Sequence, residues 1–199
     1  MEKKHQGYHG AWNDNNARSE RVADDLYPTP AEATQCLLRR VKFNGAIWEC
    51  AAGMGHISWE LIQAGYEYIS TDLCAAQYQH GETLDFLQAD KALAPNIVTN
   101  PPYKLLREFI RKALTLPGID TVAFFIPYPA IAYVGIYKLF EELGHPSLIL
   151  AMVPNFTIWM GAERGWQQSF FKHCWLVWDR REPKRSGSLF ELRDWRVVK

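Results

Sequence analysis

Short apolar runs alternate with longer amphipathic stretches along residues 27–180. The apolar runs have the length and composition of buried strands, and the longer stretches repeat apolar residues at helical spacing. The expected strands are Ala46–Cys50, Tyr68–Thr71, Ile97–Asn100, Thr121–Ile126, Leu148–Val153 and Cys174–Trp178. The expected helices are Ala31–Val41, Ile57–Gln63, Lys104–Leu114 and Ala132–Leu143. This alternation predicts an α/β fold with a mostly parallel sheet covered by helices on both faces.

The C-terminal part of the pattern differs from the rest. No helix of convincing length separates the last two expected strands, and a parallel connection needs such a crossover. We therefore expect the sheet to end in an antiparallel hairpin with a long loop, Pro154–Phe171.

The two ends of the chain are polar. Residues 1–26 lack an apolar period and are predicted to form a flexible arm that a ligand could order. Residues 27–180 are predicted to form one domain, and residues 181–199 a basic tail. Between Lys172 and Lys199, eight Lys and Arg stand against four Asp and Glu. This excess is typical of a phosphate-contacting tail, and equally of a solvated terminus.

Composition narrows the class of protein. The chain has 22 basic and 22 acidic residues, so its overall charge gives no argument for a nucleic-acid partner. The four cysteines form no CxxC pair, which predicts no metal site and favours a reducing, cytoplasmic setting. No apolar run is long enough to cross a membrane.

The stretch "ECAAGMGHIS" places a small-residue turn between an expected strand and an expected helix. Such a turn lets a ligand approach the backbone N–H groups, although it is also an ordinary tight turn. Asp72 follows at the end of the next strand, where an acidic side chain can accept two ribose hydroxyls. The stretch lacks the GK[ST] ending that binds phosphates, and Glu49 would repel a pyrophosphate but attract an ammonium or a sulfonium.

A further carboxylate, Asp85, precedes Phe86 in "LDFLQ". An acceptor and a ring at this place could hold the amine and the face of an adenine. The same pattern is common at the start of a short helix or turn.

The stretch "IVTNPPY" ends an expected strand in a rigid corner. Two consecutive prolines cannot continue a strand ladder or enter a helix interior, so the backbone leaves regular structure along a fixed path. Asn100 and Tyr103 flank these prolines, which places an amide and a ring at that corner.

Taken together, these stretches resemble the class I S-adenosylmethionine-dependent methyltransferases, and among them the enzymes that methylate adenine N6. The resemblance runs from Tyr27 to about Arg180 and implies a Rossmann-like sheet with S-adenosyl-L-methionine as cofactor. The cofactor-binding residues that it implies are Tyr27, Thr29, Pro30, Glu49, Ala51, Gly53, Gly55, Asp72, Leu73, Asp85 and Phe86. The catalytic residues that it implies are Asn100, Pro101, Pro102 and Tyr103.

The corner explains how a poorly nucleophilic amine can react. If the Asn100 oxygen and the Pro101 carbonyl accept hydrogen bonds from an NH₂ group, they stabilise the positive charge that develops on nitrogen. Tyr103 offers a ring for a planar substrate, unless it belongs to the core. An adenine in DNA must be flipped out of the stack, and Phe156 and Trp159 on the long loop are candidate stacking partners, or fill that loop's own core.

The acceptor is left open between DNA, which we favour, RNA adenine and a protein glutamine, all of which present a planar NH₂ group. The chain has no room for a long target-recognition region between Gly55 and Asn100 or after Asp179. We therefore expect a minimal enzyme that uses the arm and the 154–171 loop, a homodimer or a recruiting partner. A non-catalytic cofactor-binding module is the alternative outside enzymes. A nicotinamide dehydrogenase is disfavoured because no pyrophosphate loop is evident.

Overall fold

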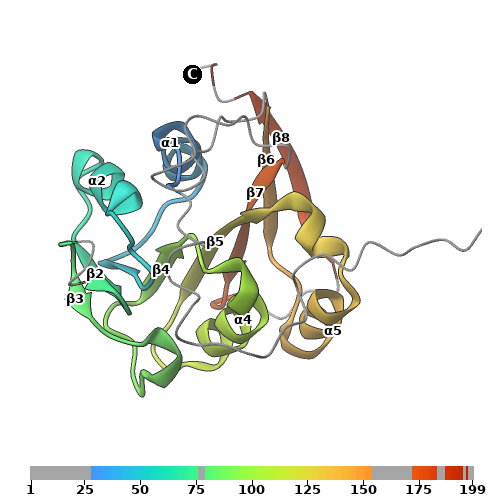
Figure 1. The fold of residues 1–199 in the computed structure, drawn as a ribbon. Helices are drawn as coiled ribbons and strands as arrows, with labels where there is room; N and C mark the ends of the chain where they lie inside the picture. Colours follow the sequence, from blue (N-terminus) through green and yellow to red (C-terminus); the bar gives the residue numbers. More distant parts are fainter. Residues whose placement is uncertain (1–27, 76–78, 154–171, 183–186, 195, 197–199) are drawn as a thin grey trace, which may run out of the picture.

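The structure is a computed structural model that describes residues 28–75, 79–153, 172–182, 187–194 and 196. Within them, one mixed sheet has the strand order β3-β2-β1-β4-β5-β7-β6-β8 (Figure 1). The strands are β1 Ile47–Glu49, β2 Tyr68–Asp72, β3 Glu82–Thr83, β4 Asn96–Thr99, β5 Thr121–Pro127, β6 Leu148–Val153, β7 His173–Asp179 and β8 Leu189–Asp194. Strand β7 runs antiparallel to β5 and β6, and the other neighbouring pairs are parallel.

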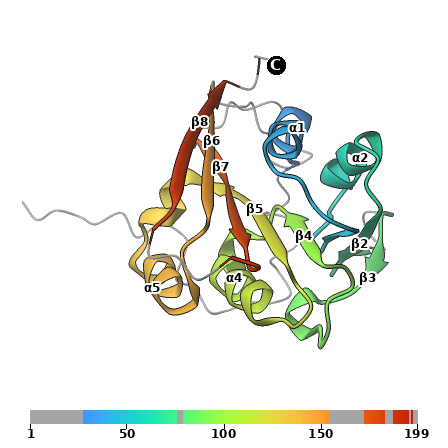
Figure 2. The same cartoon turned by 180° about the vertical axis from the view of Figure 1, so that it is seen from behind.

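Helices cover both faces of this sheet. Helices α1 Ala31–Arg40 and α2 His56–Gln63 lie on one face, and α4 Leu106–Thr115 and α5 Val134–Leu143 lie on the other (Figure 1, Figure 2). Short 3₁₀ turns complete the connections: η1 Phe86–Gln88, η2 Tyr103–Leu105 and η3 Tyr128–Ala132. The mostly parallel α/β fold with a C-terminal antiparallel pair is thus confirmed.

The core follows from the two-residue period of the strands. Along β5, Val122, Phe124 and Ile126 pack toward α4 and α5, whereas Ala123 and Phe125 pack toward α1 and α2. All residues of β5 are buried, as expected for a central strand covered on both faces. The same alternation places Glu49, two residues after Ile47, on the face that α2 covers.

Two strands were not predicted from the sequence. Strand β3 has only two residues, which is too short for a periodic signal. Strand β8 lies within residues 181–199, which the sequence assigned to a basic tail, and it pairs with β6. Its side chains are largely solvent-accessible, with Leu189 51% and Leu192 60% exposed, so its residues lack the buried pattern of a strand. The sheet therefore extends beyond residue 180.

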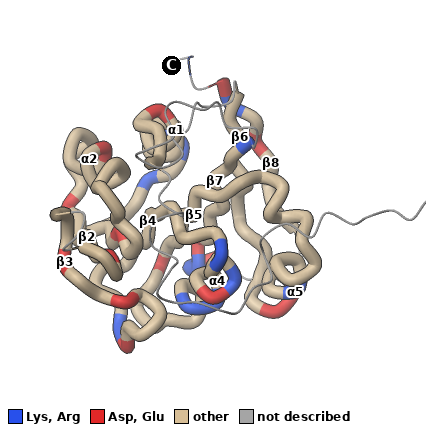
Figure 3. Tube along the Cα trace, in the orientation of Figure 1, with Lys and Arg blue, Asp and Glu red and all other residues tan. Residues whose placement is uncertain are grey.

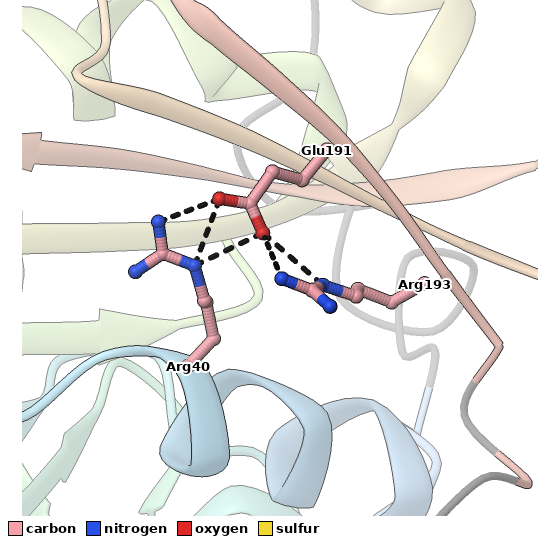
Figure 4. Close-up of polar contacts among 3 residues, drawn as sticks. All are labelled: Arg40, Glu191 and Arg193. Carbon is pink, nitrogen blue, oxygen red and sulfur yellow. Dashed lines mark hydrogen bonds and ion pairs between the residues drawn. The ribbon is translucent and has the colours of Figure 1, made fainter.

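A group of three charged side chains joins β8 to α1 (Figure 4). Glu191 on β8 accepts a hydrogen bond from Arg40 Nη2 at 2.6 Å, and Arg40 Nε lies 2.9 Å from the same oxygen. Arg193 Nη2 donates to the other oxygen of Glu191 at 2.8 Å. These hydrogen bonds hold the pKa of Glu191 at about 2, well below its ordinary value. The edge strand is thus attached to the helix that precedes β1.

Candidate active site

A cavity opens where β1, β2 and β4 end. The chain goes to one side of the sheet after β1 and to the other after β4, and a crevice forms where neighbouring parallel strands diverge in this way. Glu49 ends β1, Asp72 ends β2 and Asn100 follows β4, and all three line the cavity. The remaining lining residues are Pro28, Thr29, Cys50, Ala51, Ala52, Gly53, Met54, His56, Ile57, Leu73, Cys74, Leu84, Asp85, Phe86, Leu87, Pro102, Lys104, Leu105 and Phe109.

The loop after β1 is built on glycine and held by Asp72. Gly53 and Gly55 have φ angles of 52° and 78°, a region that favours glycine, and Gly55 is the residue before α2. The Asp72 carboxylate accepts from Gly53 N at 2.8 Å through Oδ2 and from Cys74 N at 2.7 Å through Oδ1. Each carboxylate oxygen can accept a second hydrogen bond, so the residue that fixes the loop can also bind a hydroxyl.

Glu49 is the buried acid of the cavity, and its side chain is 1% exposed. Burial raises the pKa of Glu49 to about 8, and the Asp72 charge adds to this effect, although a hydrogen bond from the Ser58 hydroxyl opposes it. The sequence suggested a carboxylate at this position, whereas the structure favours the protonated acid at neutral pH. The difference arises because α2 seals this end of β1 from water, which a sequence pattern does not show.

Asn100 is fixed by a residue from the start of the domain. Its amide Nδ2 donates to Thr29 Oγ1 at 3.1 Å, across 71 positions of sequence. Thr29 is buried and lines the same cavity. Thr29 and the "NPPY" stretch, which lie far apart in the sequence, therefore meet in the cavity.

Asp85 caps a short helix, as one of its two alternatives expected, and its contact with a cofactor stays a prediction. Asp85 Oδ1 accepts from Leu87 N at 3.0 Å, so the residue is the cap of η1, and it also lines the cavity. The neighbouring Phe86 is 2% exposed, and its ring packs against Trp48 and Phe109 at centroid distances of 5.2 and 5.0 Å. Phe86 is thus a core residue that also forms part of the cavity wall.

The remainder of the proline corner lies beside the cavity. Pro102 lines it, whereas Pro101 is buried and is not part of the lining. Tyr103 begins η2, is partly exposed, and its ring centroid lies 6.2 Å from that of His173. His173 in turn stacks on Phe125 at 5.0 Å, so three rings lie in series next to the corner.

The structure brings most predicted site residues together. Among the predicted cofactor and catalytic residues, Thr29, Glu49, Ala51, Gly53, Asp72, Leu73, Asp85, Phe86, Asn100 and Pro102 line the cavity. Pro30, Gly55, Pro101 and Tyr103 lie next to lining residues in the chain without lining it themselves. Tyr27, Phe156 and Trp159 fall outside the described residues.

Some polar residues of the cavity were not assigned to the site from the sequence. His56 starts α2, and partial desolvation and the nearby His80 lower the pKa of its imidazole. Cys74 follows Asp72, and burial raises the pKa of its thiol. Lys104 flanks the proline corner in the sequence, where an exposed charge needs no special role, and it also lines the cavity.

Basic residues gather on and just before α4, next to this rim (Figure 3). Arg111 on this helix forms an ion pair with Glu142. Arginines of the C-terminal segment also bond within the chain: Arg181 to Asp179, Arg193 to Glu191 and Arg196 to Asp194. These internal pairs reduce the charge that a phosphate-contacting tail would offer.

The described residues contain neither a metal-binding cluster nor a membrane-spanning helix. They contain no cluster of three or more His, Cys, Asp or Glu side chains arranged to bind a metal ion. No described helix is both long and apolar enough to span a bilayer.

Comparisons with known proteins agree on the fold. No family model and no curated protein matches the sequence. A candidate RNA methyltransferase from Pyrococcus horikoshii superposes with a TM-score of 0.58 at 16% identity, covering 82% of this chain and 89% of its own. The modification subunit of a candidate type I restriction enzyme from Vibrio vulnificus gives a TM-score of 0.56 at 12% identity. That match covers 84% of this chain and 47% of the subunit.

A third structure is a candidate class I S-adenosylmethionine-dependent methyltransferase from Listeria monocytogenes, with a TM-score of 0.51 at 12% identity. The match covers 81% of this chain and 62% of the Listeria protein. This chain therefore has the Rossmann-like fold of the class I methyltransferases, which was the fold expected from its sequence.

Proposed function

We propose that this protein is an S-adenosylmethionine-dependent methyltransferase that methylates a planar exocyclic amine, with adenine N6 of DNA as the favoured acceptor. One observation carries the proposal: Asn100, held by Thr29, lies on the rim of the same cavity that Glu49 and Asp72 line. A polar corner suited to an amine and a pocket suited to a nucleoside cation thus share one space. The fold shared with methyltransferases supports the assignment.

The residues of the cavity fit the cofactor. Gly53 lines the cavity with its N–H bonded to Asp72, Asp72 has acceptor capacity for a ribose, and Asp85 lines the same cavity. Glu49 lines the cavity, so a cationic group bound there would favour its ionised carboxylate over the protonated acid. When bound, S-adenosylmethionine supplies an electrophilic methyl group.

The chemical step needs orientation more than a strong base. The Thr29 hydroxyl fixes the Asn100 amide plane, so the amide oxygen has a set direction relative to the rim. An amine that donates to this oxygen keeps its lone pair directed at the cofactor, and the positive charge that develops on nitrogen faces a negative dipole. Pro101 and Pro102 maintain that geometry through their fixed φ angles.

The fold does not distinguish the three acceptors, so they are ranked on other grounds. DNA is favoured because the "NPPY" stretch resembles that of adenine-N6 methyltransferases. RNA is the second candidate because the Pyrococcus horikoshii protein, itself a candidate RNA methyltransferase, is matched over 89% of its length. A glutamine amide is the third acceptor with the same planar NH₂ group.

The test is to supply methyl-labelled S-adenosylmethionine with duplex DNA, single-stranded DNA, RNA or protein extract, and to identify the labelled atom by mass spectrometry. We expect N6-methyladenine in DNA, and much slower labelling with Asn100→Ala. Label found in RNA adenine or in glutamine would mean that RNA or protein, and not DNA, is the acceptor. Cofactor binding without label in any substrate would favour a binding module, and absence of binding would overturn the proposal.

A further inference from the structure

Glu49 belongs to a chain of hydrogen bonds that leads away from the cavity. The Ser58 hydroxyl on α2 bonds Glu49 Oε2, and Ser58 Oγ lies 2.5 Å from Ser70 Oγ on β2. Ser70 Oγ lies 3.2 Å from His80 Nε2. Glu49, Ser58 and Ser70 are buried, with exposed fractions of 1%, 0% and 8%, whereas His80 is partly exposed. The chain therefore connects a buried acid to a residue that reaches solvent.

Two glycines allow His80 to take this position. A Cβ on Gly55 would lie 2.6 Å from His80 Nε2, so the imidazole packs directly on the loop before α2. A Cβ on Gly81 would lie 2.7 Å from the Ser70 carbonyl oxygen, so the segment after His80 can approach β2 only as glycine. Both glycines have positive φ angles. His80 is thus built into the back of the cavity loop.

Serine hydroxyls can pass a proton because each one donates and accepts. With Glu49 protonated, its O–H can donate to Ser58, Ser58 to Ser70, and Ser70 to His80 Nε2. All bonds then point the same way, toward an imidazole nitrogen that can accept a proton. With Glu49 ionised, the same four groups can hold every bond in the opposite direction.

We propose that this series of hydrogen bonds is a proton relay, through which Glu49 transfers its proton to His80 when the cationic cofactor binds in the cavity. The inference rests on the proposed function. In the transfer, the O–H bond of Glu49 breaks and an N–H bond forms on His80, while each serine gives up one proton and receives another. No proton is lost from the protein, and the negative charge of Glu49 appears next to the cation. His80 acts as a positioning residue, since it sets the charge of a residue that it does not touch.

Other charged groups surround the relay. Asp72 at the end of β2 disfavours the ionised form of Glu49, and the buried Cys50 thiol next to it has a pKa well above its ordinary value. His56 from α2 lies near His80 and is the one histidine that lines the cavity among the described residues. Asp85, Cys74 and Lys104 line the cavity farther along. His56 is therefore the competing proton acceptor that an experiment must separate.

Calorimetry of S-adenosylmethionine binding at pH 7 in buffers of different ionisation enthalpy counts the protons released. The wild-type protein should release almost none, because the proton stays on His80. His80→Gln should release up to about one proton more per cofactor bound, since the proton of Glu49 must then go to solvent. His145→Gln, on a histidine bonded to Glu141, is the matched control and should resemble wild type.

Nuclear magnetic resonance gives a readout that a purely structural role would not change. The ring carbon-bound protons of His80 should move toward the positions of the protonated imidazole on cofactor binding, and should not move so in Glu49→Gln. Equal proton counts in wild type and His80→Gln, or a changed count only in His56→Gln, would overturn the relay and leave the proposed function intact. Absence of S-adenosylmethionine binding to the wild type would overturn the proposed function, and the relay with it.

Discussion

Asn100 Nδ2 donates a hydrogen bond to Thr29 Oγ1 at 3.1 Å, and this contact joins the segment before α1 to the corner after β4. Both residues line one cavity. An amide that turned freely would present its oxygen or its nitrogen to a substrate, and only the oxygen can accept from an amine. Thr29 therefore sets the polarity of the corner.

We predict that Thr29→Val lowers the rate of methyl transfer by about tenfold, the equivalent of about 1.4 kcal/mol, because valine keeps the volume but not the acceptor. Thr29→Ser keeps the hydroxyl and should retain most of the rate. Single-turnover kinetics with saturating cofactor measure the effect. Equal rates for the valine variant and the wild type would mean that the hydrogen bond does not orient Asn100.

We predict that Asp72→Ala weakens S-adenosylmethionine binding by about 1–3 kcal/mol, because charge-assisted hydrogen bonds to the ribose are lost. The variant also removes the acceptor for Gly53 N and Cys74 N, which loosens the loop. Isothermal titration calorimetry gives the affinity. Asp90→Ala, at an exposed position after η1, is the matched control. An affinity equal to that of the control would remove Asp72 from the cofactor site.

We predict that Glu49 makes the folded state less stable as pH rises between about 5 and 8. Its pKa is about 8 in the folded chain against an ordinary value of 4.5, so the folded state holds more protons than the unfolded state within this window. The contribution is complete below the lower value and is lost as pH rises through the upper one. The slope is about 1.4 kcal/mol per pH unit in mid-window for one proton.

Urea denaturation at several pH values tests this effect by comparing the wild type with Glu49→Gln. The glutamine cannot titrate, so the free energy of unfolding should fall less steeply with pH. Glu142→Gln, at an exposed ion pair with Arg111, is the matched control. Parallel pH profiles for Glu49→Gln and the wild type would mean that Glu49 is already ionised when buried.

We predict that Arg40→Ala destabilises the protein by about 1 kcal/mol or less, because the pair with Glu191 is partly solvated, with side chains 38% and 16% exposed. The loss should appear as faster hydrogen exchange in β8, which this arginine ties to α1. Arg196→Ala is the control, since Arg196 pairs with Asp194 two residues away and joins no second element. Equal exchange in the two variants would show that β8 does not depend on the contact.

Local patterns predicted the central elements well because a short window of sequence shows which residues are apolar and where a turn interrupts them. Leu148–Val153 has the same bounds in the sequence-based prediction and in β6, since all six residues of this run are apolar and four of them are buried. Strand β8 was missed because its stability comes from pairing with β6 and from Arg40 rather than from its own pattern. Long-range pairing of an exposed strand leaves little local signal.

Those site residues that belong to short sequence motifs could be predicted from the sequence. The glycine loop, Asp72 and Asn100 could be placed at the ends of parallel strands, and the structure brings them to one cavity. The protonation of Glu49 could not be predicted, because it depends on α2 sealing the acid and on Ser58 bonding it. The Thr29–Asn100 bond likewise required the fold, since no sequence window spans both residues.

The central claim is that Asn100 orients and polarises the amine that receives the methyl group. The most direct measurement is the single-turnover rate of Asn100→Ala with cofactor saturating, beside its affinity for S-adenosylmethionine and an Asn44→Ala control at an exposed position. We predict a rate about 10²–10³ lower than wild type, with cofactor affinity nearly unchanged and the control unaffected. A wild-type rate in Asn100→Ala would show that the corner is structural and that the acceptor is held elsewhere.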